Sequence, residues 1–434
     1  MKSLLTTFGI GLLLLTIAGP IRLAAQEPEH PKAQIRYSVK VLGSLGGTSC
    51  CLVIEINDRG WVDFTSNLSG DQNFHPVLWR NGQLIDLGTL GGPNASVGGM
   101  NDHGDVTVGG SDTGIPDPLG EDACSFGTHQ TCLSYVWHQG KRTPVPTLGG
   151  NNNDVNAINN RGDVLAFAET PDADPTCVTP QVLGYEAFIW QPRTGEIRVL
   201  HPLAGDSVSV AFDINDRGQA VGYSGGCGSA LGDFSTAYHA VMWQNGKPAD
   251  LGNFGGNINI PLGINNRGDV VGILQLPVIG LVGHAFLWTK GHLTDLGTLP
   301  GDVTSWGNRI NDDGVVAVQS CDANGNCRAA IWRDGVMTDL NTLIPANSQL
   351  FLEVANSINS RGEIVGYALD QETGATVPFL ATPCDRQESD SDACAQPADD
   401  TSTSRQPRAL SLPDSLRQQL RRQRGFGLGA VRAR

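Results

Sequence analysis

The chain has 434 residues and a formal net charge of −15, with 17% charged residues and 55 glycines. A glycine-rich, weakly charged composition is typical of many short strands joined by tight turns, and it argues against a helical protein. The negative charge argues against binding of nucleic acid or anionic lipid by the body of the chain, and it favours cationic partners.

The first residues have the features of an export signal. Lys2 precedes a short apolar run that ends at Ala18, and the small residues Ala24 and Ala25 offer a cleavage point. We therefore predict a signal peptide over residues 1–25, a linker over residues 26–36, and a secreted or periplasmic protein. The apolar run is short for a membrane span, and an uncleaved anchor is the alternative.

Three motifs repeat in a fixed order along the rest of the chain. The first, Ile-Asn-Asp-Arg-Gly at residues 56–60, has seven copies. The second, His-Pro-Val-Leu-Trp at residues 75–79, recurs with its Trp until a degenerate last copy, in which Ala381 takes the place of Trp. The third is Asp-Leu-Gly-Thr-Leu-Gly-Gly at residues 86–92. The copies of the first motif begin at Ile56, Met100, Ile158, Ile214, Ile264, Ile310 and Ile358.

Each repeat is predicted to be four antiparallel strands, A to D. The Asn-Asp-Arg-Gly motif between apolar segments is typical of a tight hairpin turn whose glycine takes a positive φ, and Asn and Asp side chains stabilise such turns. A variable loop follows strand B, and strand C ends near the Trp. An Asn-Gly pair such as Asn81-Gly82 then predicts a two-residue hairpin between strands C and D. A four-stranded unit of this length matches a propeller blade.

The ends of the array favour a closed ring. The array begins with a strand D at residues 37–47 and stops after the seventh strand C at residues 378–383. In a ring, the N-terminal strand can complete the last blade and protect its edge. We predict an all-β, seven-bladed propeller over residues 37–383, with an open solenoid or two half-domains as alternatives. Residues 384–434 are predicted to be a mostly disordered tail with a short basic amphipathic helix at residues 411–423.

The repeated motifs also resemble those of a known family. His-Ala-Phe-Leu-Trp at residues 284–288, together with residues 86–92 and 56–60, resembles the bacterial extracellular HAF repeat family, which is named after its His-Ala-Phe motif. The resemblance covers residues 37–383. It implies secretion and a propeller-like array, and it assigns no catalytic residue to this chain. Ala381 departs from the pattern at the expected closure.

Ten cysteines suit an oxidising compartment. Six of them fall in the loops between strands B and C, which we call the B–C loops. We predict local bridges Cys124–Cys132 and Cys321–Cys327 and a bridge Cys177–Cys227 between neighbouring blades. Cys50 and Cys51 lie near the first strand A, and Cys384 and Cys394 are expected to pair beyond the ring.

Functional residues are expected where the repeats differ. The B–C loops share one face of the ring, and long insertions occupy residues 108–133, 168–184 and 224–238. A second candidate is the position before each Ile-Asn, because Glu55, Asp213 and Arg309 would converge there if strand A lines a central channel. We predict these three as ligand-binding residues, with charged channel walls as the alternative. The recurrent residues His75, His239 and His284, and the recurrent Trp of strand C, are assigned to the scaffold.

The leading functional hypothesis is therefore an exported binding module that recognises a glycan or a protein through the B–C loop face. One alternative is a propeller hydrolase or lyase that acts on an extracellular polysaccharide with channel carboxylates. Another is a passive surface or matrix protein. We expect a monomer, and we expect no cofactor, metal site, catalytic residue, nucleic-acid partner or transmembrane segment.

Overall fold

The structure is a computed structural model that describes residues 35–228, 234–277 and 283–384, together with Cys394. All of these belong to the unit Ile35–Arg434. The predicted signal peptide and the predicted helix at residues 411–423 lie outside the described residues. No helix within the described part is long and apolar enough to cross a membrane.

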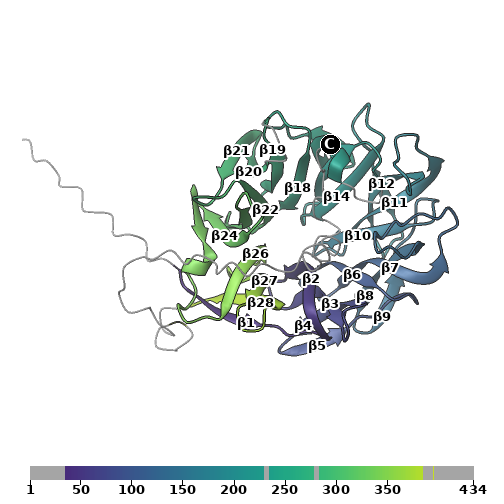
Figure 1. The fold of residues 1–434 in the computed structure, drawn as a ribbon. Helices are drawn as coiled ribbons and strands as arrows, with labels where there is room; N and C mark the ends of the chain where they lie inside the picture. Colours follow the sequence, from purple (N-terminus) through teal and green to yellow (C-terminus); the bar gives the residue numbers. More distant parts are fainter. Residues whose placement is uncertain (1–34, 229–233, 278–282, 385–393, 395–434) are drawn as a thin grey trace, which may run out of the picture. The chain divides into compact units, whose positions relative to one another are not determined.

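The described strands form seven four-stranded antiparallel sheets around a common axis, as Figure 1 shows, so the predicted seven-bladed propeller is confirmed. Blade 1 contains β2 (Gly46–Ile56), β3 (Val62–Leu68), β4 (Phe74–Arg80) and β5 (Gln83–Asp86). Blade 2 contains β6 (Ala95–Met100), β7 (Val106–Pro116), β8 (Gln130–His138) and β9 (Lys141–Pro144). Blade 3 contains β10 (Asn153–Ile158), β11 (Val164–Ala173), β12 (Leu183–Trp190) and β13 (Ile197–Leu200).

The remaining blades repeat this order. Blade 4 contains β14 (Val208–Ile214), β15 (Gln219–Gly225), β16 (His239–Gln244) and β17 (Lys247–Asp250), with the 3-10 turn η1 (Phe234–Thr236) before β16. Blade 5 contains β18 (Asn259–Ile264), β19 (Val270–Gln275), β20 (Gly283–Thr289) and β21 (His292–Gly297). Blade 6 contains β22 (Thr304–Ile310), β23 (Val316–Cys321), β24 (Cys327–Arg333) and β25 (Val336–Asp339), followed by η2 (Leu340–Thr342). Blade 7 contains β26 (Leu350–Ile358), β27 (Ile364–Asp370), β28 (Thr376–Pro383) and the N-terminal strand β1 (Tyr37–Val41).

Blade 7 closes the ring as predicted. β1 pairs with β28 in an antiparallel register that runs from Tyr37 opposite Pro383 to Val41 opposite Phe379. The expected strand boundary at residue 47 was wrong: β1 ends at Val41, and the chain turns through Gly43, whose φ is +90°, before β2 begins. β28 also begins two residues earlier than expected, at Thr376.

The repeated motifs adopt the predicted turns. In blade 1 the Asn57 Oδ1 atom accepts hydrogen bonds from the backbone N–H groups of Arg59 and Trp61, both at 3.0 Å, while Gly60 takes a φ of +74°. Asn81 and Gly82 both have positive φ, as a type I′ hairpin requires. Each blade is therefore held by side chains that cap its own turns.

The hydrophobic core lies between neighbouring blades. In one cluster, Ile56, Phe64 and Trp79 of blade 1 pack with Val365 and Leu380 of blade 7. Trp79, Trp190 and Trp243 are buried, which confirms the scaffold assignment for these three positions. The recurrent histidines make local contacts: His75 Nδ1 lies 2.9 Å from Asp86 Oδ2, and His284 Nδ1 lies 3.0 Å from Asp295 Oδ2.

Candidate functional site

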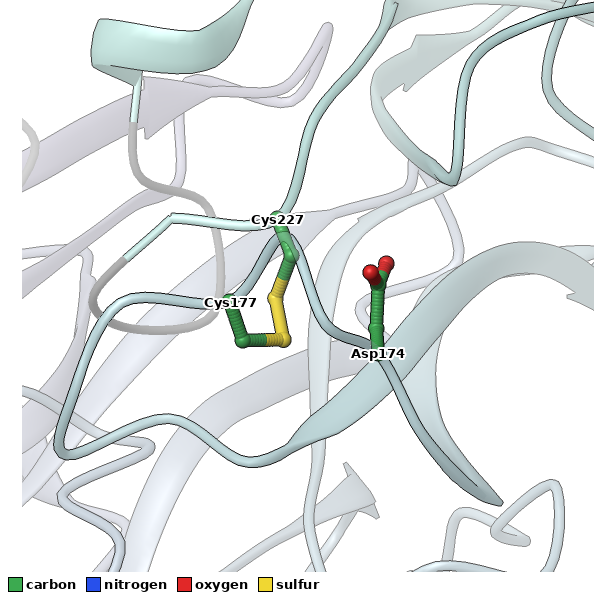
Figure 2. A group of neighbouring side chains, drawn as sticks. All are labelled: Asp174, Cys177 and Cys227. Carbon is green, nitrogen blue, oxygen red and sulfur yellow. A yellow bond between two sulfur atoms is a disulfide. The ribbon is translucent and has the colours of Figure 1, made fainter.

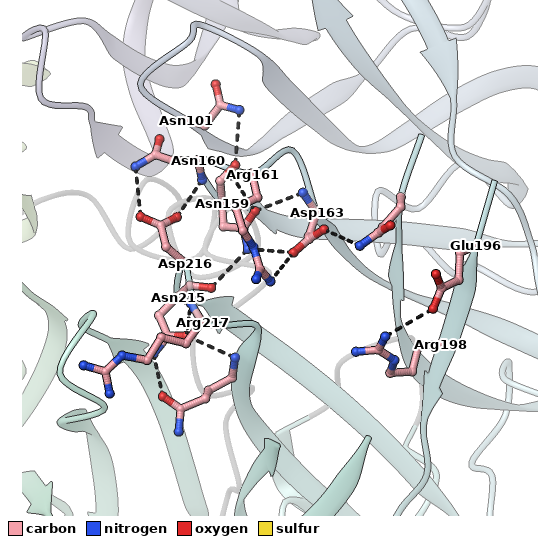
Figure 3. Close-up of polar contacts among 12 residues, drawn as sticks. Asn101, Asn159, Asn160, Arg161, Asp163, Glu196, Arg198, Asn215, Asp216 and Arg217 are labelled. Atoms are coloured by element: carbon pink, nitrogen blue, oxygen red, sulfur yellow. Dashed lines mark hydrogen bonds and ion pairs between the residues drawn. The ribbon is translucent and has the colours of Figure 1, made fainter. Parts of the chain in front are cut away.

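The seven repeated asparagines form a closed ring of hydrogen bonds around the axis. Each side-chain Nδ2 donates to the backbone carbonyl of the equivalent asparagine in the next blade, at 3.0 to 3.2 Å. Figure 3 shows the part of the ring that contains Asn101, Asn159 and Asn215. The members of the ring are Asn57, Asn101, Asn159, Asn215, Asn265, Asn311 and Asn359. One residue type thus serves the turn through its oxygen and the blade interface through its nitrogen.

A hollow of about 200 Å³ opens at the turn end of the axis and is lined by this ring and by the residue after each asparagine. At that next position, Oδ1 accepts a hydrogen bond from the backbone N–H of the preceding blade at six boundaries. Ser360 holds the seventh position. The Asn160 amide also donates to Asp102 at 2.9 Å and to Asp216 at 3.3 Å, as Figure 3 shows for Asp216. Because these oxygens already bind N–H groups, the acidic mouth is explained as part of the scaffold.

The structure brings together the three charged residues that were predicted for the channel. Arg309 Nε donates to Glu55 Oε1 at 2.9 Å, and the Arg309 Nη2 atom contacts the same oxygen. Arg309 Nη1 donates to the carbonyl of Leu262 at 2.6 Å. The Asp213 carboxylate is held by the backbone N–H groups of Ile214 and Ile264, each at 2.8 Å. Through its contacts with Glu55 and the Leu262 carbonyl, Arg309 of blade 6 is linked to blades 1 and 5 across the axis.

The channel charges are largely shielded from water. The Arg309 and Glu55 side chains are only 20% and 15% exposed. Burial raises the pKa of Glu55 and of Asp213, and in both cases the Arg309 guanidinium opposes the rise. Burial, followed by the nearby charge of Glu55, raises the pKa of Asp63 well above its usual value. Glu55 and Arg309 bind each other, and Asp213 accepts from backbone N–H groups. The ligand-binding role of these three residues therefore stays a prediction.

The loop face of the ring carries the predicted disulfide bonds. The structure contains Cys124–Cys132, Cys177–Cys227 and Cys321–Cys327. It also contains the predicted bridge Cys384–Cys394. Figure 2 shows that the Cys177 and Cys227 sulfurs are joined beside Asp174, so these three side chains do not offer free thiolates to a metal.

The long loop of blade 3 is tied to blade 4 by more than its disulfide. The backbone N–H of Val178 donates to the carbonyl of Gly228 at 3.0 Å. The backbone N–H of Cys227 donates to the Thr176 hydroxyl at 3.1 Å. The predicted insertions are too wide at their starts, because β7 continues to Pro116 and β11 continues to Ala173. Strands therefore carry much of these insertions.

A buried cluster of acids and amides ties the loop of blade 2 to blade 3. We call it the acid cage, and it consists of Asp117, Glu121, Asn152, Glu169 and Gln181. All five residues are buried. Sequence reasoning missed this cluster, although its signal was present: the inserted loops of blades 2 and 3 contain acids and no Lys or Arg.

Two carboxyl groups form the centre of the acid cage. Glu121 Oε1 accepts from the backbone N–H groups of Val182 at 2.7 Å and Leu183 at 2.9 Å. Glu169 Oε2 accepts from the backbone N–H of Asn152 at 3.0 Å. Gln181 Nε2 lies between the carboxyls, 3.2 Å from Glu121 Oε1 and 2.9 Å from Glu169 Oε1. Burial and then the contact with Glu121 raise the pKa of Glu169 to about 7, although Asn152 and Gln181 lower it.

The loops above the cage expose large apolar side chains. Five of them, 37% to 64% exposed, lie on the inserted segments of blades 2, 3 and 4. They are Ile115, Leu119, Val178, Val182 and Tyr238. The three insertions, residues 108–133, 168–184 and 224–238, contain eight Asp or Glu and no Lys or Arg. We call this surface the loop face of blades 2–4; it is cross-linked and exposes apolar side chains, and the acids that reach it among the described residues are Asp122, Asp172 and Asp174.

Comparisons with known proteins assign neither a family nor an activity to this chain. No family model matches the chain, and no curated protein matches its sequence. Among solved structures, an oligogalacturonate lyase in complex with manganese is 11% identical, with a TM-score of 0.49 over 81% of this chain and 96% of its own. The β-propeller domain of the Trilobed protease from Pyrococcus furiosus is 9% identical, with a TM-score of 0.46 over 80% of this chain and 93% of its own. Similarities this low carry no argument about activity.

Proposed function

We propose that this chain is an exported HAF-type repeat propeller that binds a protein partner through the loop face of blades 2–4. The partner would present an exposed segment that is both apolar and basic. Four disulfide bonds among the described residues are consistent with an extracytoplasmic location. The observation that carries the proposal is the gathering of exposed apolar side chains on loops that are tied to one another.

Several physical features of this face suit binding. Apolar side chains exposed together mark an interaction surface more often than scattered ones do. The loops are already held in place before a partner binds, by the disulfide Cys177–Cys227 and by the hydrogen bond from the Leu183 backbone N–H to Glu121. This lowers the conformational entropy that is lost on binding. Asp122, Asp172 and Asp174 are at least partly exposed and the insertions contain no Lys or Arg, so a basic partner is favoured, because complementary charges speed association and exclude acidic competitors. A protein segment supplies both the apolar and the basic groups.

The enzyme alternative receives no comparable support. Glu55 and Asp213 are the carboxylates that it would use, and both are engaged by Arg309 or by backbone N–H groups. A glycan remains the other binding ligand to test. The observations favour a protein because the exposed residues on this face are mainly aliphatic, whereas the recurrent Trp79, Trp190 and Trp243 are buried.

The test is a binding screen with the full exported chain. It would be applied to an array of peptides that vary in Lys, Arg and aliphatic content, and to a glycan array. We expect retention of basic-apolar peptides, weakened by salt. Replacing two central aliphatic residues, in the variant Leu119→Ser/Val178→Ser, should weaken binding at least about tenfold, which corresponds to about 1.4 kcal/mol.

A matched control uses exposed apolar residues on the outer strands. Ile197 and Val336 lie on β13 and β25 and are as exposed as the residues of the loop face. The variant Ile197→Ser/Val336→Ser should bind like the wild type. Binding of glycans alone, or equal binding by the loop-face variant and the control, would overturn the proposal.

A further inference from the structure

The acid cage holds two buried carboxyl groups close together, and the two insertions that form it contain no Lys or Arg to neutralise them. Glu121 and Glu169 belong to different blades, both are buried, and Gln181 Nε2 donates to one oxygen of each, at 3.2 and 2.9 Å, while the nearby Glu121 raises the pKa of Glu169. Two carboxylates in contact repel each other strongly inside a protein unless a proton or a cation lies between them. The chain supplies no Lys or Arg in residues 108–133 or 168–184 to neutralise them.

The hydrogen-bond pattern favours a proton, and not a cation, between the two carboxyl groups. Glu121 Oε1 accepts from Val182, Leu183 and Gln181, so that oxygen behaves as an acceptor only. The second oxygen, Glu121 Oε2, is buried and has no hydrogen-bond partner. A proton held between this oxygen and the Glu169 carboxyl would turn the repulsion into a hydrogen bond.

A metal ion explains the pattern less well. Calcium takes six to eight oxygen ligands. In the acid cage the Glu169 oxygens already accept from Asn151, Asn152 and Gln181. The Asp117 carboxylate accepts from the N–H groups of Leu119 and Glu121 and from the Asn152 amide. N–H groups therefore occupy the directions that a cation would need on Glu169 and Asp117, and Glu121 Oε2 and Gln181 Oε1 are the two oxygens of the cage without a hydrogen-bond partner.

We propose that Glu121 and Glu169 share one proton, and that this proton fastens the loop of blade 2 to blade 3, so that the loop face of blades 2–4 is held most tightly at acidic pH and loosens as the pH rises through neutrality. The proposal concerns the regulation of the binding face and depends on the proposed function only for its biological meaning. The fastening acts directly on the face. Glu121 holds the backbone of Val182, and Leu119 lies two residues before Glu121.

The sign of the pH effect follows from linkage. The folded-state pKa of Glu169 is raised to about 7, above its unfolded value, so the folded cage keeps a proton that the open loop releases. Stability from the shared proton is complete below the unfolded pKa and is lost as the pH rises through 7. The loss accumulates between the unfolded and the folded pKa and levels off above the folded pKa, where both states have released the proton.

Other titratable groups around the pair do not supply the missing positive charge. Asp117 and Asp122 lie on the same loop as Glu121, and the Asp122 carboxylate accepts from Gly127 N–H. His129 Nδ1 lies 2.9 Å from the Gly120 carbonyl. From the other elements, Asp154 on β10 accepts from Gly110 N–H, Asp174 accepts from Thr176, and Tyr185 on β12 pairs in register with Glu169.

Hydrogen exchange measured on the full chain tests the proposal without any partner. Rates corrected for intrinsic exchange would be compared between pH 6 and pH 8.5 for peptides that cover residues 117–123 and 178–184. We expect protection in both peptides to fall by on the order of tenfold or more, while a peptide from β22 and β23 keeps its protection. If protection in the two cage peptides does not fall between these pH values, the proposal is wrong.

Variants distinguish the proton from other causes. Glu121→Gln places a permanent N–H donor where the shared proton would lie and keeps an oxygen for Val182 and Leu183, so protection should become independent of pH. Glu169→Gln is the mirror variant if the first does not fold. Asp122→Asn, next to Glu121 in sequence, should keep the wild-type dependence. Retention of that dependence by both Gln variants would overturn the proposal.

A last measurement tests whether a bound cation, and not a proton, stabilises the acid cage. The wild type would be measured at pH 8.5 with calcium and with a chelator. Unchanged exchange supports the shared proton. Protection that calcium restores and the chelator removes would overturn it in favour of a cation site. Because the exchange assay needs no partner, its result is separate from the peptide screen. If protection in the cage peptides depends on pH as expected but no peptide binds, the proposed function is rejected and this inference stands.

Discussion

Asn359 donates a hydrogen bond from its side-chain amide to the backbone carbonyl of Asn57, 302 positions earlier in the chain, at 3.1 Å. The same asparagine caps its own turn, because its Oδ1 accepts from the N–H groups of Arg361 and Glu363 at 3.0 Å. Closure of the ring therefore depends on side chains as well as on the β1–β28 pairing. It also explains why asparagine, with both a donor and an acceptor, stands at all seven positions.

The asparagine ring predicts a specific cost for losing only the donor. Asn215→Asp keeps the oxygen that accepts from Arg217 and Gln219, but its carboxylate cannot donate to the Asn265 carbonyl. We expect the free energy of unfolding at pH 7 to fall by about 1–3 kcal/mol, the cost of an unsatisfied buried group. At a pH below about 4 the aspartic acid is protonated and can donate, so the loss should shrink. Urea unfolding at both pH values measures this.

The control for the ring is Ser360→Ala. Ser360 lies beside Asn359, and its backbone N–H still donates to Asp58 after the change. Its free energy of unfolding should stay within about 0.5 kcal/mol of the wild type. A loss for Asn215→Asp that is no larger than that of the control would show that the ring contributes nothing.

The ion pair in the channel predicts a larger effect. Arg309→Met removes the cation that faces Glu55 and Asp213 and leaves two buried carboxyls whose pKa burial already raises. Breaking a buried pair from one side costs about 3–5 kcal/mol. These carboxyls have raised folded-state pKa values, so the penalty grows as the pH rises above their unfolded values and declines in acid. Unfolding by denaturant at pH 5 and pH 8 should show the larger loss at pH 8.

The double variant Glu55→Gln/Arg309→Met separates a structural pair from a ligand site. It removes both charges, so it should recover part of the stability that Arg309→Met loses. If Glu55 and Arg309 instead serve mainly to bind a ligand, neither single variant would change stability much, and the pair would not be a structural link between the blades.

The disulfides predict a ranking. Cys177–Cys227 spans 50 residues and Cys321–Cys327 spans 6. Chain-entropy reasoning gives about 4 kcal/mol for the first bridge and about 2 kcal/mol for the second. Alanine replacement of both cysteines should therefore lower the unfolding free energy more for the Cys177–Cys227 pair. Equal losses in parallel denaturant titrations would contradict this ranking.

The repeat made the fold readable from sequence. Asn-Asp-Arg-Gly and Asn81-Gly82 encode turns through local chemistry, and the strand left over at each end predicts the seam between β1 and β28. The disulfide pairings also followed from the repeat, since it placed each cysteine in a known loop. The end of β1 at Val41 was missed, because no residue before Gly43 breaks the strand pattern.

The candidate site was harder to predict. The acid cage joins residues 117–121 to residues 181–183 and to the start of β10 across a blade boundary, and these segments differ from every other repeat. No repeat-equivalent position marks them, so spacing gives no register. For Glu55 and Arg309 the sequence predicted that both side chains reach the channel, but not that they pair. Which blades are joined across the axis depends on how far each side chain extends.

Asp154 offers a last prediction on pH. It lies at the start of strand β10, buried beside the Cys124–Cys132 bridge, and accepts from the N–H groups of Gly110 and Val155, both at 2.7 Å. Burial raises its pKa to about 6, above the unfolded value, although both N–H groups lower it. The folded state therefore holds an extra proton between those two values, and stability from this group is lost as the pH rises toward and through 6. Asp154→Asn cannot titrate, so the difference in unfolding free energy between the variant and the wild type should shift in favour of the variant from pH 4 to pH 7. A constant difference across that range would show that the Asp154 carboxyl titrates alike in the folded and unfolded chain.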